Sequence, residues 1–206
     1  IQGMKINESE LEVFVSDKNL VTVDCDLNTK VKKVIEMLKN SQRPLIHIGQ
    51  GIKISKSEAD FIALVESHNL PFVTARNAND IVASDHRLYV GRPGTYGQRG
   101  ANFAVQNSDL YLAIGTRLAL AQTGYASHDY ARNARKVIVD IDQAELDKKT
   151  LSPDIKIQTD AKLFITELKN QLSDVSLNTS SWAKKCRDWK KKYPVVLPEY
   201  QKQKCP

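Results

Sequence analysis

Four glycines recur at every third position of the segment GRPGTYGQRGAN, residues 91–102. They are Gly91, Gly94, Gly97 and Gly100, and the whole chain has only 9 glycines. A collagen triple helix needs a long run of such triplets with abundant proline, which this segment lacks. The alternatives are a tight turn or a backbone that must come close to a ligand. Because the segment leads into a predicted helix, its free backbone amides could face an anion.

Small and polar residues also follow the predicted strands, at the point where each strand ends. They are Gly49, Gly51, Thr74, Arg76, Gly115, Thr116, Arg117, Asp140, Asp142 and Asp160. The two acids at 140 and 142 could accept hydrogen bonds from ribose or amino groups, and either arginine could pair with a phosphate. The alternative is that the small residues only turn the chain and the arginines lie in solvent. The standard dinucleotide fingerprint is absent, because Ile54 stands where its third glycine would be.

Five short apolar segments predict strands that are buried on both faces of a parallel sheet. They span residues 44–49, 71–75, 110–116, 136–142 and 155–160. Apolar residues at helical spacing predict helices over 28–40, 55–69, 98–109 and 161–172. Ser55 and Glu58 predict a capping box for the second helix, and Asp160 predicts the N-cap of the fourth. This alternation predicts an α/β fold, a doubly wound, mostly parallel Rossmann-like sheet with helices on both faces, which binds ligands at the carboxyl ends of its strands.

The charge and cysteine patterns limit the possible partners. Residues 182–206 hold eight Lys or Arg and two acids, which accounts for the whole net charge of +6. The rest of the chain is neutral and lacks the basic stripe of a nucleic-acid interface, so no nucleic-acid partner is predicted. No apolar run is long enough to span a bilayer, so no membrane partner is predicted either. Three widely spaced cysteines, without a CxxC pair, argue against disulfides and structural zinc and favour a cytoplasmic protein.

Composition divides the chain into three parts. Residues 1–27 are predicted to be a connector from a preceding domain, and 28–173 a central nucleotide-binding-type α/β domain. Residues 174–206 are predicted to form a helix and a proline-rich linker toward a following domain. One face of that helix carries Trp182, Cys186, Trp189 and Tyr193, and it would pack either on this domain or on a neighbour. Because the chain opens in mid-pattern at Ile1, we expect a piece of a longer protein.

The ordered set of motifs resembles the central domain of thiamine-diphosphate-dependent enzymes, above all of acetolactate synthase large subunits. The matching segments are RPLIHIGQGI, LPFVTARNANDIVASDHRLYVGRPGTYGQRGAN, SDLYLAIGTRL, ARKVIVDIDQAELDK and TDAK, between about residues 43 and 170. The resemblance implies a crevice that holds a structural FAD in acetolactate synthases and ADP, or nothing, in relatives. By match to the family, the contact positions are Gly49, Gly51, Thr74, Arg76, Gly94, Thr95, Tyr96, Gly115, Thr116, Arg117, Asp140, Asp142 and Asp160.

The resemblance also implies what the whole protein does. It would be a decarboxylase or carboligase that acts next to a 2-oxo carbonyl, in the manner of the enzymes of branched-chain amino acid biosynthesis. Thiamine diphosphate and Mg²⁺ would bind outside this fragment, since no Gly-Asp or Asp-Gly pair occurs in it. The fragment alone would have no catalytic residue and no metal site. Its partners would be the enzyme's own N-terminal and C-terminal domains, in a homodimer or homotetramer.

Two places depart from the acetolactate synthase pattern. Ala119, Leu120 and Ala121 stand where two acids and an arginine are usual, and Tyr96 stands where a histidine is usual. These changes remove polar partners of a flavin. The sequence therefore leaves open FAD, ADP or an empty crevice, and also a sibling decarboxylase or a lyase of the 2-hydroxyacyl-CoA lyase type. A freestanding nucleotide-binding or regulatory domain is the remaining alternative.

Overall fold

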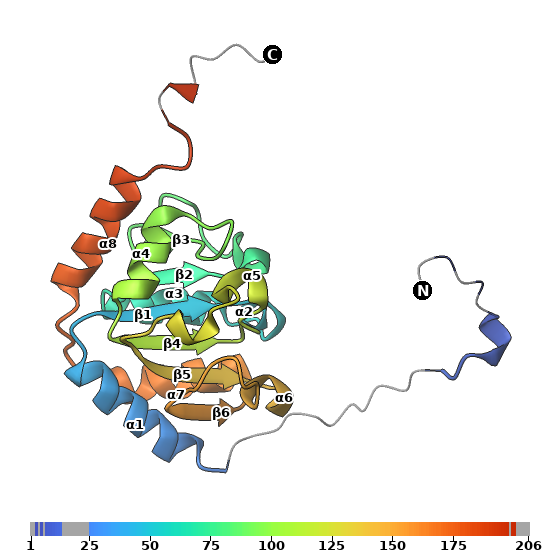
Figure 1. Cartoon of the computed structure of the whole chain (residues 1–206). Helices are drawn as coiled ribbons and strands as arrows, with labels where there is room; N and C mark the ends of the chain where they lie inside the picture. Colours follow the sequence, from blue (N-terminus) through green and yellow to red (C-terminus); the bar gives the residue numbers. More distant parts are fainter. Residues whose placement is uncertain (1–2, 4, 6, 14–24, 198, 201–206) are drawn as a thin grey trace.

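The structure is a computed structural model that describes residues 3, 5, 7–13, 25–197 and 199–200. In this part of the chain, one parallel sheet has the strand order β3-β2-β1-β4-β5-β6. Its strands are β1 Pro44–Ile48, β2 Phe72–Thr74, β3 Tyr89–Gly91, β4 Leu110–Ile114, β5 Arg135–Asp140 and β6 Ile155–Gln158. The order changes direction between β1 and β4, which confirms the predicted doubly wound α/β fold. The carboxyl ends of β1, β4 and β5 point toward the side where α2, α5 and α6 lie in Figure 1.

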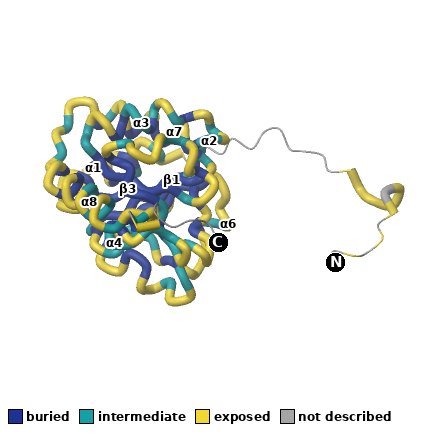
Figure 2. Tube along the Cα trace, turned by 90° about the horizontal axis from the view of Figure 1, so that it is seen from above, coloured by how far each residue is buried: buried dark blue, intermediate teal, exposed yellow. Residues whose placement is uncertain are grey.

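Helices cover both faces of this sheet. The longer ones are α1 Leu27–Asn40, α3 Glu58–Ser67, α4 Arg99–Asn107, α7 Ala161–Leu172 and α8 Ser180–Lys192. The shorter ones are α2 Gly51–Ile54, α5 Leu120–Thr123, α6 Gln143–Leu146 and the 3-10 turns Glu8–Glu10, Arg76–Ala78 and Ser127–Asp129. One core lies between the sheet and α1, α3 and α7, and the other between the sheet and α4 and α8. Figure 2 shows the buried strands enclosed by more exposed helices.

The strands are buried because successive side chains enter opposite cores. In β1, Ile46 and Ile48 belong to the core under α1, α3 and α7, whereas Leu45 belongs to the core under α4 and α8. All five residues of β1 and all five of β4 are buried. This explains the unbroken apolar runs, since a strand covered on both faces has no solvent side to mark with polar residues.

The edge strand β3 was not predicted. It has only three residues, Tyr89–Gly91, and it lies inside a polar segment with glycine and proline on its carboxyl side. Its pairing with β2 is irregular, with a shift in register next to Phe72. A strand this short is defined by its neighbour in the sheet rather than by its own periodicity.

The helix predicted over 55–69 is found as α3, but it begins later than predicted, at Glu58, and its predicted capping box is wrong. The short helix α2 ends at Ile54, just before the predicted start. Ser55 instead donates its hydroxyl to the Ile52 carbonyl at 3.1 Å, at the end of α2. Lys56 then adopts a left-handed conformation with φ of 54°, which breaks the helix. By contrast, Asp160 caps α7 as predicted, because its carboxylate accepts from the Lys162 amide at 2.7 Å.

The apolar face of α8 packs on this domain. Trp182 and Cys186 are buried in the core beside α4, and the Trp182 indole donates to the Pro44 carbonyl at 2.9 Å. The backbones of α4 and α8 approach so closely that a Cβ on Gly100 would lie 3.1 Å from the Lys190 nitrogen. Residues 1–2, 4, 6 and 14–24 of the predicted connector, and residues 198 and 201–206 of the predicted linker, lie outside the described residues.

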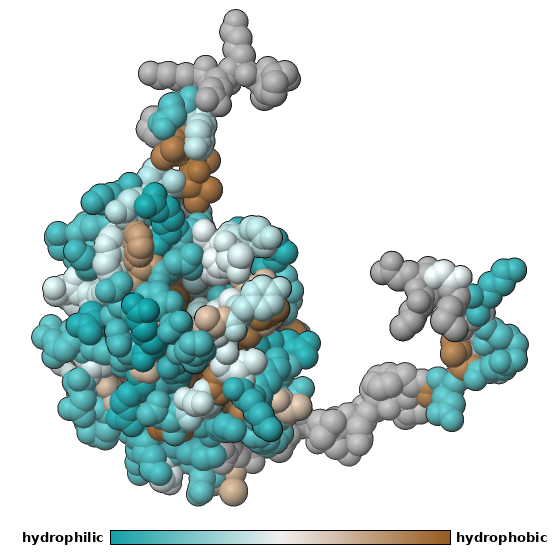
Figure 3. All heavy atoms as spheres, viewed as in Figure 1, coloured by the Kyte–Doolittle hydropathy of each residue, from teal (hydrophilic) through white to brown (hydrophobic). Residues whose placement is uncertain are grey.

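The surface is mainly polar on the face shown in Figure 3. Across the described residues, no helix combines the length and the apolar character needed to cross a membrane. Cys25 is exposed and Cys186 buried, and both are free thiols.

Candidate functional site

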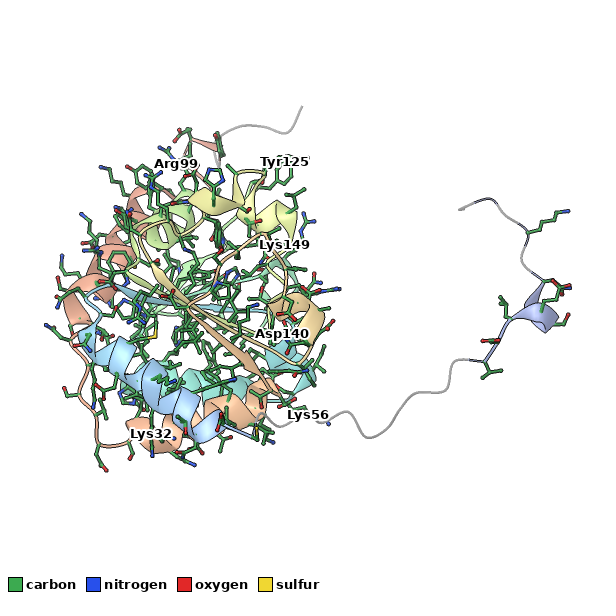
Figure 4. All side chains as sticks on the ribbon, turned by 60° about the horizontal axis from the view of Figure 1, so that its bottom comes forward. Lys32, Lys56, Arg99, Tyr125, Asp140 and Lys149 are labelled. Carbon is green, nitrogen blue, oxygen red and sulfur yellow. The ribbon has the colours of Figure 1, made fainter. Side chains whose placement is uncertain are left out.

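A crevice of about 470 Å³ opens at the carboxyl ends of β1, β4, β5 and β6. This is the edge of the sheet where the fold predicts a ligand. It is lined by Gln50, Gly51, Ile54, Asn77, Gly115, Arg117, Val139, Asp140, Ile141, Asp142, Glu145, Thr159, Asp160 and Ala161. Figure 4 labels Asp140 on the side of the molecule where Lys56 and Lys149 also lie.

The glycines on this edge are required by the chain itself. A Cβ on Gly49 would lie 2.2 Å from the Gly115 carbonyl oxygen, and one on Gly51 would lie 2.7 Å from the Gly115 Cα. Gly115 has a positive φ of 56°, and it accepts a hydrogen bond from the Gly51 amide at 3.0 Å. The turns after β1 and β4 therefore cross at a distance that excludes side chains, whether or not a ligand is bound.

Three aspartates at the carboxyl ends of β5 and β6 line the crevice, and each accepts a hydrogen bond from a backbone amide. Asp140 accepts from the Asp142 amide at 3.0 Å, and Asp142 accepts from the Ala144 amide at 2.9 Å as the N-cap of α6. Asp160 caps α7 in the same way. Burial raises the pKa of Asp140, and the hydrogen bond that its carboxylate accepts from the Asp142 amide opposes this shift only in part. The ionised form of Asp140 is therefore less favourable than that of an aspartate in water.

Arg117 lines the crevice but is bound to Glu145. Its Nε and Nη2 atoms donate to the same carboxylate oxygen at 2.8 and 2.6 Å, and Lys148 pairs with the other oxygen. The Glu145 side chain is 7% exposed, whereas that of Arg117 is 76% exposed. Burial acts to raise the pKa of Glu145, but the hydrogen bonds from Lys148 and Arg117 outweigh it and leave the pKa lowered. A ligand phosphate would have to compete with Glu145 for this guanidinium.

The hydroxyl of Thr159 is a buried polar group of the crevice that lacks a hydrogen-bond partner among the described residues. Thr159 is 1% exposed and immediately follows β6, and its amide donates to the Asp140 carbonyl at 3.0 Å. An unpaired buried hydroxyl is unfavourable, so it marks a position where a ligand group could complete the bonding.

The glycine-rich segment makes close backbone contacts and hydrogen bonds within the protein. Gly94 has φ of 129°, and a Cβ there would lie 2.6 Å from the Ala121 carbonyl oxygen. The Gly94 amide donates to the Asn102 side chain at 2.8 Å, and the Thr95 amide donates to the Ala121 carbonyl at 2.9 Å. The Gly97 amide is also bonded, to the Gly94 carbonyl at 2.9 Å. These three amides are therefore not free to face an anion, and any such contact would have to come from the first turn of α4.

The structure brings together six of the thirteen predicted contact positions. Those lining the crevice are Gly51, Gly115, Arg117, Asp140, Asp142 and Asp160. The positions outside its lining are Gly49, Thr74, Arg76, Gly94, Thr95, Tyr96 and Thr116. Thr74 is buried and shares hydrogen bonds with Tyr89 and Asn79, whereas Arg76 is exposed. Thr116 is 4% exposed and lines a separate small hollow beside Glu145.

Sequence reasoning missed Glu145, Thr159, Gln50 and Ile141 among the lining residues. A local signal existed for Glu145, since it stands three residues after the N-cap Asp142, a common place for an acid in the first helical turn. Ile54 and Ile141 are 74% and 46% exposed, so they give the crevice two accessible apolar side chains. The sequence could not predict this, because an isoleucine that will be exposed has the same residue type as one that will be buried.

A buried hydrogen-bonded chain supports the loop above the strand ends. His47 in β1 contacts the Tyr111 hydroxyl through Nδ1, and Tyr111 contacts Tyr130 at 2.9 Å. Gln122 in α5 places its amide nitrogen 3.2 Å from Nε2 of His47 and accepts from the Ala119 amide at 3.1 Å. Nε2 therefore accepts and Nδ1 carries the proton. Burial lowers the pKa of His47 to about 3, so the ring is neutral.

Comparisons with known proteins identify the family of this chain. Residues 31–168 match the family described as "Thiamine pyrophosphate enzyme, central domain". The chain is 30% identical over 178 residues to the acetolactate synthase large subunit of Cyanidium caldarium, which covers 84% of this chain and 30% of that protein. It is 33% identical over 152 residues to a probable acetolactate synthase large subunit of Methanococcus aeolicus, covering 74% of this chain and 25% of that protein.

The chain thus spans less than a third of the curated relatives that it matches. An acetolactate synthase of Mycobacterium bovis shows the same relation, with 32% identity over 139 residues, 68% of this chain and 22% of that protein. The matched residues include all six strands in full, α1 from its second turn, and the whole crevice. The chain belongs to the thiamine pyrophosphate enzyme family, as its central domain.

Proposed function

We propose that this chain is the central module of a thiamine-diphosphate-dependent enzyme that makes or breaks a bond next to a 2-oxo carbonyl, as acetolactate synthases do. We further propose that its crevice holds the adenosine end of a nucleotide. The family match and the names of the relatives support the first statement. The buried, unpartnered Thr159 hydroxyl in an acidic crevice at the ends of β4, β5 and β6 carries the second.

The lining suits a nucleoside better than a phosphate. Its carboxylates at 140, 142 and 160 can accept hydrogen bonds from ribose hydroxyls or from the adenine amino group. Ile54 and Ile141 offer apolar area to a planar ring. Arg117 is the one cation of the lining, and it is already paired with Glu145. A diphosphate would therefore lie outside the acidic part of the crevice.

The flavin end of FAD finds less support than the adenosine end. Ala119, Leu120 and Ala121 are all exposed, and their side chains have no polar atom. Leu120 is 52% exposed at the start of α5. These residues can contact a ring but cannot hydrogen-bond its polar edge. We therefore propose an ADP-type ligand ahead of FAD.

Within the described residues, no group of three His, Cys, Asp or Glu side chains could hold a metal ion. We propose that the parts of the protein that flank this domain bind thiamine diphosphate and Mg²⁺, in a homodimer or homotetramer. The isolated chain would then show no activity, and no catalytic step is assigned to it.

Calorimetric titration of the chain with ADP, FAD and adenosine tests the crevice. We expect the crevice itself to bind ADP and adenosine with similar affinity, because it contacts the nucleoside. Asp140→Asn should weaken both, whereas Asp174→Asn, which changes an exposed acid outside the lining, should leave both unchanged. Absence of heat with all three ligands would reject the nucleotide proposal. Release of CO₂ from a 2-oxo acid by the whole protein, but not by this chain, would test the enzyme class.

A further inference from the structure

A second hollow, of about 780 Å³, lies under α8 at the amino ends of β1 and β4. We name it the α8 groove. It is lined by Gln42, Arg43, Asn107, Asn178, Ser181, Trp182, Lys184, Lys185, Asp188 and Trp189. The groove is on the opposite edge of the sheet from the crevice, as the positions of α8 and α6 in Figure 1 show. Its α8 wall lies outside the residues that match the family.

Two positive charges in the groove are not neutralised. Arg43 donates from Nε to the Asn107 carbonyl at 2.7 Å, and within the described residues its two terminal nitrogens have no partner. Lys185 lies 5.4 Å from the centre of the Trp189 ring and pairs with no described carboxylate. Asp188 is the acid of the lining, and Lys184 pairs with it at 3.1 Å. The hydrogen bond to the Asn107 carbonyl fixes the Arg43 guanidinium and leaves its two terminal nitrogens available. Two such nitrogens can donate to two oxygens of one anion.

The remaining lining combines a rigid aromatic wall with uncharged polar groups. The rings of Trp182 and Trp189 pack edge to face, with centres 5.6 Å apart, and the Pro44 carbonyl anchors the indole of Trp182. The side chains of Gln42, Asn178 and Ser181 have no hydrogen-bond partner among the described residues. The α8 groove can therefore stack a ligand ring, hydrogen-bond its polar groups and pair with its anionic group.

We propose that the α8 groove binds a small ring-bearing organic phosphate. Arg43 and Lys185 contact the phosphate, Trp189 contacts the ring, and the amide and hydroxyl side chains bind its polar edge. The site is separate from the crevice, in which carboxylates outnumber the single paired arginine. A long nucleic acid is not expected, since the cations lie in one short groove together with Asp188 rather than along a stripe.

Tryptophan fluorescence gives a readout specific to this groove, because both tryptophans of the chain line it. ADP serves as the probe, with adenosine and pyrophosphate as its two halves. We expect ADP to change the emission in a saturable manner, and each half to bind more weakly than ADP. Arg43→Met and Lys185→Gln should each weaken ADP binding, the first by about tenfold or more.

The matched control is Lys191→Gln, which removes the same charge from an exposed position of α8 outside the lining. It should leave ADP binding unchanged. An equal loss in this variant would show a diffuse charge effect and overturn the proposal, as would the absence of a saturable change at millimolar ADP. Asp140→Asn separates the two sites: it should leave the fluorescence titration unchanged, and abolition of the signal would assign the binding to the crevice instead. Arg43 and Lys185 are both exposed, so both variants should fold, and a circular dichroism spectrum of each checks this.

Discussion

Thr159→Val is the sharpest test of the crevice, because it removes one atom that the protein leaves unbonded. Valine keeps the branched shape of threonine, so the surrounding core is not disturbed. A buried hydroxyl without a partner destabilises a protein by about 1–3 kcal/mol. Thr159 is 1% exposed, and its hydroxyl has no partner among the described residues. We therefore expect the free energy of unfolding of the ligand-free chain to rise by about 1 kcal/mol, and Tm by about 2–4 °C.

Ligand binding should change in the opposite direction. If the Thr159 hydroxyl bonds to a nucleoside, its loss removes about 0.5–1.5 kcal/mol from the complex and raises the Kd for ADP up to roughly tenfold. Thermal unfolding with and without ADP measures both effects on one sample. The variant should start from a higher Tm and gain less from the ligand than the wild type does.

Thr116→Val is the matched control. Thr116 is also buried, at 4% exposed, and its hydroxyl also lacks a partner among the described residues, but it lies outside the crevice lining. It should stabilise the ligand-free chain to a similar extent and leave the Kd for ADP unchanged. A lower Tm in Thr159→Val, or a loss of ADP affinity in Thr116→Val alone, would refute our reading of the crevice and favour the contact predicted from sequence.

Three further results are expected. The pKa of His47 is lowered from 6.5 to about 3 in the folded protein. The stability that the neutral ring contributes is therefore present above pH 6.5 and is lost as pH falls toward 3, on the order of 4 kcal/mol in all. Urea unfolding across this pH range should show the decline, and His47→Asn should reduce it. The folded pKa of Glu145 is depressed below its ordinary 4.5, so Glu145→Gln should flatten the loss of stability below that pH, by under about 1 kcal/mol because Arg117 is exposed. Gly100→Val should destabilise the chain by about 2 kcal/mol and shift tryptophan emission to the red, since a side chain there meets the backbone at Lys190; an unchanged spectrum would contradict this docking of α8.

Much of the framework follows from local sequence. The runs at 44–48 and 110–114 are apolar without alternation, and both proved to be strands buried on two faces. Asp160 was predicted and found as the N-cap of α7. Such features depend on residues close together in the chain, and their side-chain chemistry is sufficient to specify them.

The glycines are positions whose role could not be predicted from local sequence. Their number suggested either a tight turn or a backbone that approaches a ligand, and the structure shows a backbone that approaches itself. Gly49 and Gly51 meet Gly115, Gly94 meets Ala121, and Gly100 meets Lys190. These contacts join segments far apart in sequence, so residue type alone could show that space was lacking but not what occupied it.

The α/β alternation, the family resemblance and the edge of the sheet on which polar residues gather all follow from residue types and their spacing. Which of those residues share a crevice depends instead on how the chain folds. The tertiary structure paired Arg117 with Glu145, brought the unpredicted Thr159 to the lining and moved Thr116 away from it. It also formed β3 from three residues that pair with β2. The physical reason is that hydrogen-bond partners and burial are set by segments that meet only on folding, whereas hydrophobic periodicity is already present in the unfolded chain.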